Sequence, residues 1–202
     1  MPLVMSARAI DLNRSLVVQV NRPCLGEITG VSSILFAYVA AGSPALFELW
    51  GMKRKVTGKD LTKEAPRSPR IRVGGYAILG RTIDKCRALL AGNIGEYHFD
   101  CPLDNMLFGF KGVNGADFKA QIEQGASDSE MVEWLNQSGE KKMPEEIKRW
   151  AEEVEASSLY NHPEKREFFS EEVKKLGLDP ANTTTFQWLE VDDRVSHAQK
   201  AA

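Results

Sequence analysis

The densest group of reactive side chains in the chain lies between residues 81 and 104. The first half of the group combines charges of both signs with a thiol, and the second half adds carboxylates, an imidazole, a phenol and another thiol. The residues concerned are Arg81, Asp84, Lys85, Cys86 and Arg87, followed by Glu96, Tyr97, His98, Cys101 and Asp104. A turn at Gly92 that folds the second half back on the first would let both halves line one cleft.

Cys101 is the candidate nucleophile of this group. It precedes Pro102 at the expected start of a helix, where the positive end of the helix dipole favours a thiolate. His98 lies three residues earlier and is the candidate base. A cysteine before a proline is more often a packed or capping residue, so a purely structural role stays open beside the catalytic one.

The same stretch also fits a binding site. Guanidinium groups suit planar oxyanions, so we predict a site for a small anionic ligand or a protein partner. Its expected residues are Arg81, Asp84, Arg87, Glu96, Tyr97 and Asp104. The alternative is that these charges form a solvated face or are held by local ion pairs.

A metal site is a weaker hypothesis for the same residues. His98 and Cys101 are separated by two residues, and Cys86 or Asp104 would have to supply a third ligand. Structural zinc sites have four ligands in recognisable pairs, and only one mixed pair is present here. The glycine-rich patterns of dinucleotide and phosphate loops do not occur either. We therefore expect no metal and no cofactor.

Residues 52–72 form a basic segment ahead of this group. Pro66 and Pro69 push their preceding residues out of helical geometry, which predicts an extended arm. Such an arm could contact nucleic acid through its charges alone, because it has no aromatic side chains for base stacking. The net charge of the whole chain is -2, so we do not expect nucleic acid as the main partner.

Apolar periodicity predicts helices over residues 73–193. Leu79, Ile83, Cys86 and Leu90 recur at spacings of 4, 3 and 4 and form one stripe, from which Arg81, Asp84 and Lys85 point away. Gly92 is the expected end of this helix. Further helices are expected to start at Pro102, at Ser127 with Glu130 as a capping box, at Pro144 and at Pro163.

We predict an all-α domain, a compact bundle of five to seven short helices. The aromatic segment at residues 95–100 is interpreted as a loop. A last short helix is expected around Phe186 to Val191, with fraying from Asp192 and a disordered tail over residues 194–202.

Residues 1–51 differ in composition from the rest. They have few charges, and the uncharged run between Ile28 and Phe47 is diluted by polar and small residues. We interpret them as a leader or extension that is poorly ordered and not part of the fold. A membrane is not an expected partner unless residues 28–50 act as an anchor. Three scattered cysteines indicate reduced thiols and a cytoplasmic location.

Several segments resemble the bacterial family catalogued as domain of unknown function 5069. They are DLTKEAPRSPR, GGYAILGRTIDKCRALLAG, GEYHFDCPLDNMLF, GASDSEMVEWL, PEEIKRW and YNHPEKREFF. The resemblance covers about Gly58 to Asp193. It implies a small soluble bacterial protein and supplies no catalytic residue, because the family has no assigned activity.

Three hypotheses for function follow. The first is a ligand-binding or protein-interaction module that uses the cleft around Arg81 and Tyr97. The second is a small cytoplasmic enzyme with Cys101 as nucleophile, and the third is contact with nucleic acid through the basic arm.

Overall fold

The computed structural model describes the backbone of residues 54–201 and the side chains up to residue 199. The predictions for residues 1–51, including an anchor at residues 28–50, lie outside these residues. In the part of the chain that is described, no helix combines the length and the apolar character that crossing a bilayer requires.

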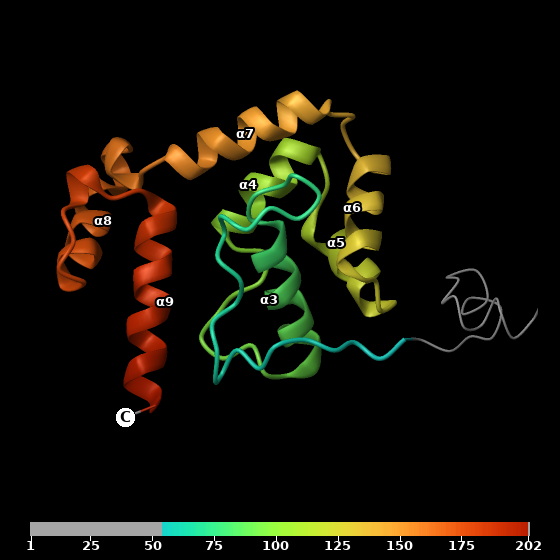
Figure 1. The fold of residues 1–202 in the computed structure, drawn as a ribbon, viewed down its shortest axis with the longest axis horizontal. Coiled ribbons are helices and arrows are strands. Elements are labelled where there is room, and N and C mark those ends of the chain that lie inside the picture. Colours follow the sequence, from blue (N-terminus) through green and yellow to red (C-terminus); the bar gives the residue numbers. More distant parts are fainter. Residues whose placement is uncertain (1–53, 202) are drawn as a thin grey trace, which may run out of the picture. The chain divides into compact units, whose positions relative to one another are not determined.

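The described residues are all-α, as predicted (Figure 1). Seven α-helices follow one another between residues 54 and 201, and the strand pairing there is one isolated bridge between Val73 and Tyr76. The helices are α3 (Leu79–Ala91), α4 (Pro102–Lys111), α5 (Gly115–Glu123), α6 (Asp128–Gln137), α7 (Pro144–Ala156), α8 (Pro163–Lys175) and α9 (Thr185–Ala201), with the short 3-10 helices η1 (Leu159–Asn161) and η2 (Pro180–Asn182) on either side of α8.

Local sequence signals place most of the helix ends. Helix α3 ends at Gly92, whose φ of 73° is left-handed, a conformation that glycine adopts without a side-chain penalty. Cys101 is the N-cap of α4, and Pro102 is its first residue. Ser127 and Glu130 form the predicted capping box of α6. The aromatic segment before α4 is a loop, as expected.

The main core forms where α3 packs against α4, α5 and α6. Leu79, Ile83 and Cys86 on the predicted stripe are fully buried there. Phe108 of α4 and Phe118 of α5 pack with ring centroids 5.3 Å apart. Burial of these apolar side chains removes a large apolar area from water, which is the main stabilising contribution to such a fold.

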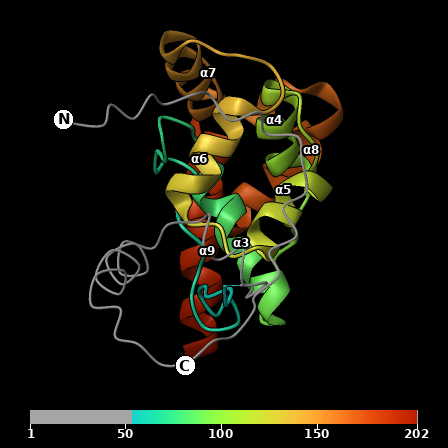
Figure 2. The ribbon, with the colours of Figure 1, turned by 90° about the vertical axis from the view of Figure 1, so that its right-hand side faces the viewer.

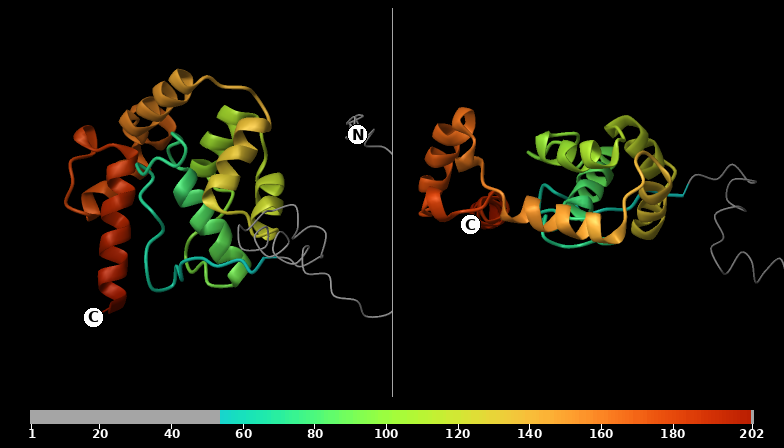
Figure 3. Two further views of the ribbon diagram at one scale, coloured as in Figure 1. Left: turned by 45° about the vertical axis from the view of Figure 1, so that its right-hand side comes forward. Right: turned by 90° about the horizontal axis from the view of Figure 1, so that it is seen from above.

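A second, smaller core connects the start of α3 with α7 and α9. It consists of Ala77, Ile78, Ala151, Val154 and Phe186. Helix α7 runs from near the end of α6 to α8 and α9, as Figure 3 shows, and Figure 2 views the same helices from the side of α5 and α6. The core residues on α7 and α9 therefore fix the later helices to the segment that begins α3.

The polar face of α3 is buried as well. Arg81, Asp84 and Lys85 are only 3%, 5% and 2% exposed. The partners that cover them come from residues 60–73, from α4 and from α9. The alternative of a solvated mixed-charge face is therefore wrong, and the ion pairs that replace it are not local ones.

Helix α9 corrects the prediction for the end of the chain. It continues to Ala201, so residues 194–201 are helical and do not form the disordered tail that we expected. The reason is tertiary, because Asp193 and His197 on this helix contact Arg81 and Tyr97. A small polar sequence gives no local sign of such contacts.

Candidate functional site

Lys85 of α3 and the start of α4 meet in a buried polar cluster. Nζ of Lys85 lies 2.8 Å from Oδ2 of Asp104 and 3.2 Å from Sγ of Cys101. It also donates to the backbone carbonyl of His98 at 3.0 Å. The other carboxylate oxygen of Asp104 accepts from the hydroxyl of Thr82 at 2.8 Å. The ammonium group thus lies between a carboxylate, a carbonyl oxygen and a thiol.

A second polar cluster connects α3, the loop before α4, and α9. The guanidinium of Arg81 binds both carboxylate oxygens of Asp193, at 2.6 and 3.0 Å. The hydroxyl of Tyr97 donates to Asp193 at 2.9 Å and lies 3.0 Å from Nε2 of His197. Burial and the neighbouring Asp193 carboxylate raise the pKa of the Tyr97 hydroxyl.

A third polar cluster connects α3 with residues 60–73 and with α6. Asp84 is bound by the guanidinium of Arg67, with the closest N to O distance at 2.8 Å. Asp128 lies between Arg67 and Arg87, at 2.5 and 2.8 Å. Arg87 also lines a hollow of about 350 Å³ between residues 55–57 and the start of α6.

The structure therefore brings the two halves of the predicted site together. Arg81, Asp84, Arg87 and Asp104 are each in an ion pair with another residue of the chain. Glu96 and His98 are exposed on the loop before α4, and His98 reaches Lys85 through its backbone oxygen. An external anion at Arg81 or Arg87 would have to displace a carboxylate that is already bound.

The metal hypothesis meets the same kind of obstacle. The ammonium of Lys85 occupies the position between Cys101 and Asp104, where the cation would have to bind. Cys86 is fully buried in the main core, and burial raises the pKa of its thiol to about 12, so it is a poor source of a thiolate ligand. Within the part of the chain that is described, no three His, Cys, Asp or Glu residues are placed to hold a metal ion.

The arginines of the basic segment are held by carboxylates of later helices. Arg70 binds Glu155 of α7 at 2.6 Å and Glu190 of α9 at 3.1 Å. Arg72 binds Glu155 at 2.5 Å. These contacts position the end of the segment against α7 and α9, and they occupy charges that contact with nucleic acid would need.

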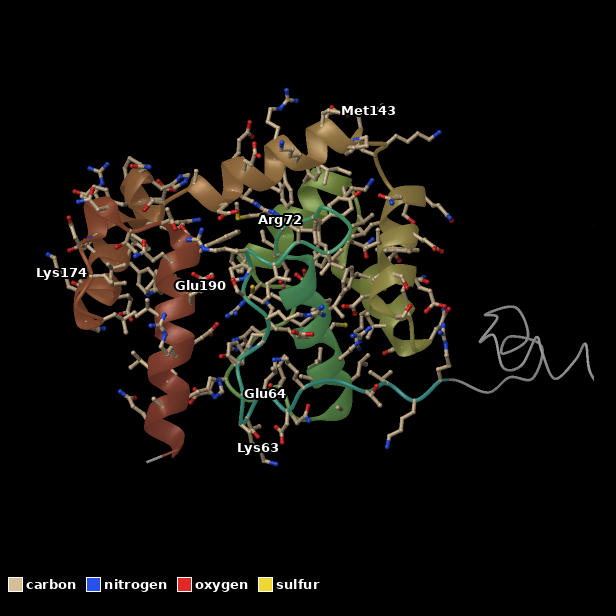
Figure 4. The ribbon with its side chains drawn as sticks, viewed as in Figure 1. Lys63, Glu64, Arg72, Met143, Lys174 and Glu190 are labelled. Carbon is tan, nitrogen blue, oxygen red and sulfur yellow. The ribbon has the colours of Figure 1, made fainter. Side chains whose placement is uncertain are left out.

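Sequence reasoning missed a groove at the start of α7. It has a volume of about 770 Å³ and lies between residues 72–75, Asn136 of α6 and residues 141–152. Its apolar lining includes Met143, Pro144 and Ile147, and Met143 is 64% exposed. Figure 4 labels Met143 at the start of α7 and Arg72 on the segment beside that helix.

The charged lining of this groove is mostly basic. Arg72, Lys141, Lys142 and Lys148 line it, against one acidic residue, Glu152. Lys142 pairs with Glu140 at 2.5 Å, and its ammonium lies 5.0 Å from the centre of the Phe110 ring. Among the residues that the structure describes, Lys141 has no ion-pair partner. The groove thus combines an apolar floor with an excess of positive charge.

Two glycines form one wall of the groove. Gly74 and Gly75 have φ values of 59° and 88° and form the two-residue turn between Val73 and Tyr76. A side chain on Gly74 would collide with Val132 of α6. Since glycine has no side chain, the turn presents only backbone atoms to the groove. The Gly-Gly dipeptide and the Lys141-Lys142 pair are the sequence signals that could have indicated this site.

Comparison with known proteins supports the resemblance drawn from the sequence segments. The family described as Domain of unknown function (DUF5069) matches residues 63–195, which is more than half of the chain. The match includes all of the residues that line the groove and, apart from His197, the residues of the three polar clusters around α3. No curated protein matches the chain. The chain belongs to the DUF5069 family.

Proposed function

We propose that the domain is a binding module for a small ligand that joins an anionic group to an apolar body. The proposed site is the groove between the Gly74–Gly75 turn and the start of α7. The observation that supports this proposal is the position of Lys141, Lys142 and Lys148 beside the apolar surface of Met143, Pro144 and Ile147. Such a surface complements a molecule with one charged end.

The size of the groove fits a small molecule. Ligand pockets in proteins have volumes of roughly 300 to 1,000 Å³, with an apolar lining and a few polar groups that orient the ligand. The groove, at about 770 Å³, falls in this range. The basic side chains can bind the anionic group at the rim while the ligand body covers exposed apolar surface, including Met143.

The groove is a better candidate than the cleft around Arg81 that we first expected. Arg81 already binds Asp193 with both ends of its guanidinium, and both side chains are buried. Breaking that pair would leave a buried charge without a partner. Lys141 and Lys148 in the groove carry no such penalty, because both side chains are exposed to solvent.

Anilinonaphthalene sulfonate is a suitable probe, since it joins an aromatic body to a sulfonate. Titration of the full-length protein should show enhanced fluorescence with saturation at one site. In the variant Lys141→Glu/Lys148→Glu the dissociation constant of the probe should rise at least about tenfold, because each replacement puts a negative charge that repels the sulfonate where a positive charge attracted it. Binding to the unchanged protein should weaken as salt is added.

A matched control makes the same change of charge elsewhere. Lys63 and Lys174 are exposed lysines that do not line the groove, and both are labelled in Figure 4. Lys63→Glu/Lys174→Glu should bind the probe almost as the unchanged protein does. Equal weakening in both double variants would show that net charge alone attracts the probe, and the proposed site would then be wrong.

A further inference from the structure

The contact between Lys85 and Cys101 is unusual because the two side chains differ in accessibility. Nζ of Lys85 lies 3.2 Å from Sγ of Cys101, and Lys85 is buried whereas Cys101 is partly exposed. Because Cys101 is partly exposed, a small oxidant from solvent can approach this residue while the amine of Lys85 stays fixed behind it. This geometry holds a nucleophilic nitrogen beside an oxidisable sulfur.

The surroundings of the sulfur favour its oxidation. Cys101 is the N-cap of α4, where its side chain faces the backbone N–H of Asp104, and the Lys85 ammonium lies on its other side. Partly exposed cysteines at helix N-termini and beside cationic groups are the ones that react with peroxides.

We propose that Cys101 is a site of oxidation by peroxides and that Lys85 captures the oxidised sulfur in a reversible nitrogen–sulfur bond. In the first step a peroxide transfers one oxygen to the thiol, which yields a sulfenic acid and water, or an alcohol from an organic peroxide. Sulfenic acids condense with nearby nitrogen atoms to give sulfenamides. The capture is intramolecular, so it has no cost of bringing two molecules together.

Asp104 supplies the proton acceptor that the second step needs. Its Oδ2 lies 2.8 Å from Nζ of Lys85 and takes one proton from the ammonium. The amine then attacks the sulfenyl sulfur, the nitrogen–sulfur bond forms and the sulfur–oxygen bond breaks. The departing hydroxide takes a second proton from nitrogen and leaves as water. The link thus differs from the thiol and amine by the loss of two hydrogen atoms.

Cys86 provides an internal contrast. It is fully buried in the main core, and burial raises the pKa of its thiol to about 12. At neutral pH the Cys86 thiol is therefore protonated and shielded from solvent, whereas Cys101 is partly exposed. Peroxide at neutral pH should leave Cys86 unchanged in the folded protein.

The test uses the full-length protein with Cys24→Ser, so that Cys24, which lies outside the described residues, does not react. The protein is treated with hydrogen peroxide, free thiols are then alkylated, and tryptic peptides are identified by mass spectrometry. The expected product is a peptide pair joined through Lys85 and Cys101 that lacks two hydrogen atoms and is absent after dithiothreitol. Trypsin should no longer cleave after Lys85.

Two other products, found in the protein that keeps both Lys85 and Cys101, would overturn the proposal. One is Cys101 oxidised to a sulfenic or sulfinic acid with Lys85 still cleaved by trypsin. The other is a Lys85–Cys101 link that retains an oxygen atom, which would show that the sulfur–oxygen bond does not break.

Variants separate capture from simple oxidation. Lys85→Arg keeps a positive charge beside Asp104 but has no amine to form the link, so Cys101 should pass to the sulfinic acid instead. Cys101→Ser keeps a hydroxyl at the N-cap position and should show neither link nor oxidation at residue 101. Protection of Cys101 from the sulfinic acid to the same extent in Lys85→Arg would contradict capture by Lys85.

Discussion

Helix α3 and the groove at α7 both carry lysine and arginine side chains, but these side chains have very different surroundings. Arg81 and Lys85 on α3 are buried, and each is paired with a carboxylate from α9 or α4. Lys141 and Lys148 at the groove are exposed. The ion pair of Lys148, with Glu152 at 3.9 Å, lies one turn along the same helix.

This difference separates structural charges from charges that are available for binding. A buried ion pair fixes two distant segments in one geometry, and removal of one partner leaves an uncompensated charge. An exposed pair between neighbours on a helix contributes little to stability and exchanges easily with an external ion. Reactive residue types cluster around α3, but the cations there are buried in ion pairs, whereas Lys141 and Lys148 beside the groove are exposed.

The largest expected effect comes from removing the partner of Lys85. Asp104→Ala leaves the Lys85 ammonium buried without a carboxylate and also removes one of the two acceptors of the Thr82 hydroxyl. We expect the free energy of unfolding to fall by about 3 to 5 kcal/mol, measured by urea denaturation.

Glu145→Ala is the matched control for Asp104→Ala. Glu145 is also an acidic residue in the first turn of a helix, but it is exposed. Its replacement should change the free energy of unfolding by no more than about 0.5 kcal/mol. A loss below about 1 kcal/mol for Asp104→Ala would mean that the buried pair is not structural.

A smaller loss is expected where α9 meets α3. Asp193→Asn keeps the shape of the side chain but removes the charge that Arg81 binds at 2.6 and 3.0 Å. We expect a loss of about 1.5 to 3 kcal/mol. The variant should increase the rate of amide hydrogen exchange more in α9 than in α3, because this contact holds α9 against α3. Unchanged exchange in α9 would show that other contacts hold the helix.

The helices could be predicted from the sequence because their signals are local. Pro102, the Ser127–Glu130 capping box and Gly92 determine helix ends through contacts within one turn of the chain. The stripe of Leu79, Ile83 and Cys86 likewise depends only on helical spacing. These features do not require knowledge of the tertiary structure.

The ion pairs around α3 and the position of the groove could not be predicted in the same way. Arg81 and its partner Asp193 are 112 positions apart in sequence, so no local pattern shows that they are paired. Ile78 has a φ of 68°, a conformation rare for a β-branched residue, and tertiary packing holds it at the start of α3. The groove requires three separate segments to meet, and only its Gly-Gly turn and basic residues are visible in the sequence.

A pH-dependent effect is expected at α6, where an ion pair is partly exposed. The Arg54 guanidinium, together with the backbone N–H of Ser127, lowers the pKa of Glu130 from 4.5 to about 2. A lowered pKa in the folded state gives stability that is present above about pH 4.5 and is lost as the pH falls toward 2. The advantage of the unchanged protein over Glu130→Gln should therefore shrink over that interval.

Urea denaturation at several pH values measures this difference. Glu133→Gln, at an exposed glutamate on the same helix, is the control and should show a small difference with little dependence on pH. If the difference between the unchanged protein and Glu130→Gln stays constant between about pH 4.5 and 2, the Arg54–Glu130 pair does not contribute to folding in solution.

The smallest effect on stability is expected at the groove itself. Lys148→Ala removes an exposed side chain whose ion pair with Glu152 is long, so the free energy of unfolding should change by less than about 0.5 kcal/mol. Affinity for anilinonaphthalene sulfonate should nevertheless decrease, because the lost charge lies beside the apolar floor. A residue that affects binding without affecting stability is what a binding groove requires. A Lys148→Ala variant that loses stability but not affinity would place this lysine with the structural charges of α3 and leave the groove without its proposed role.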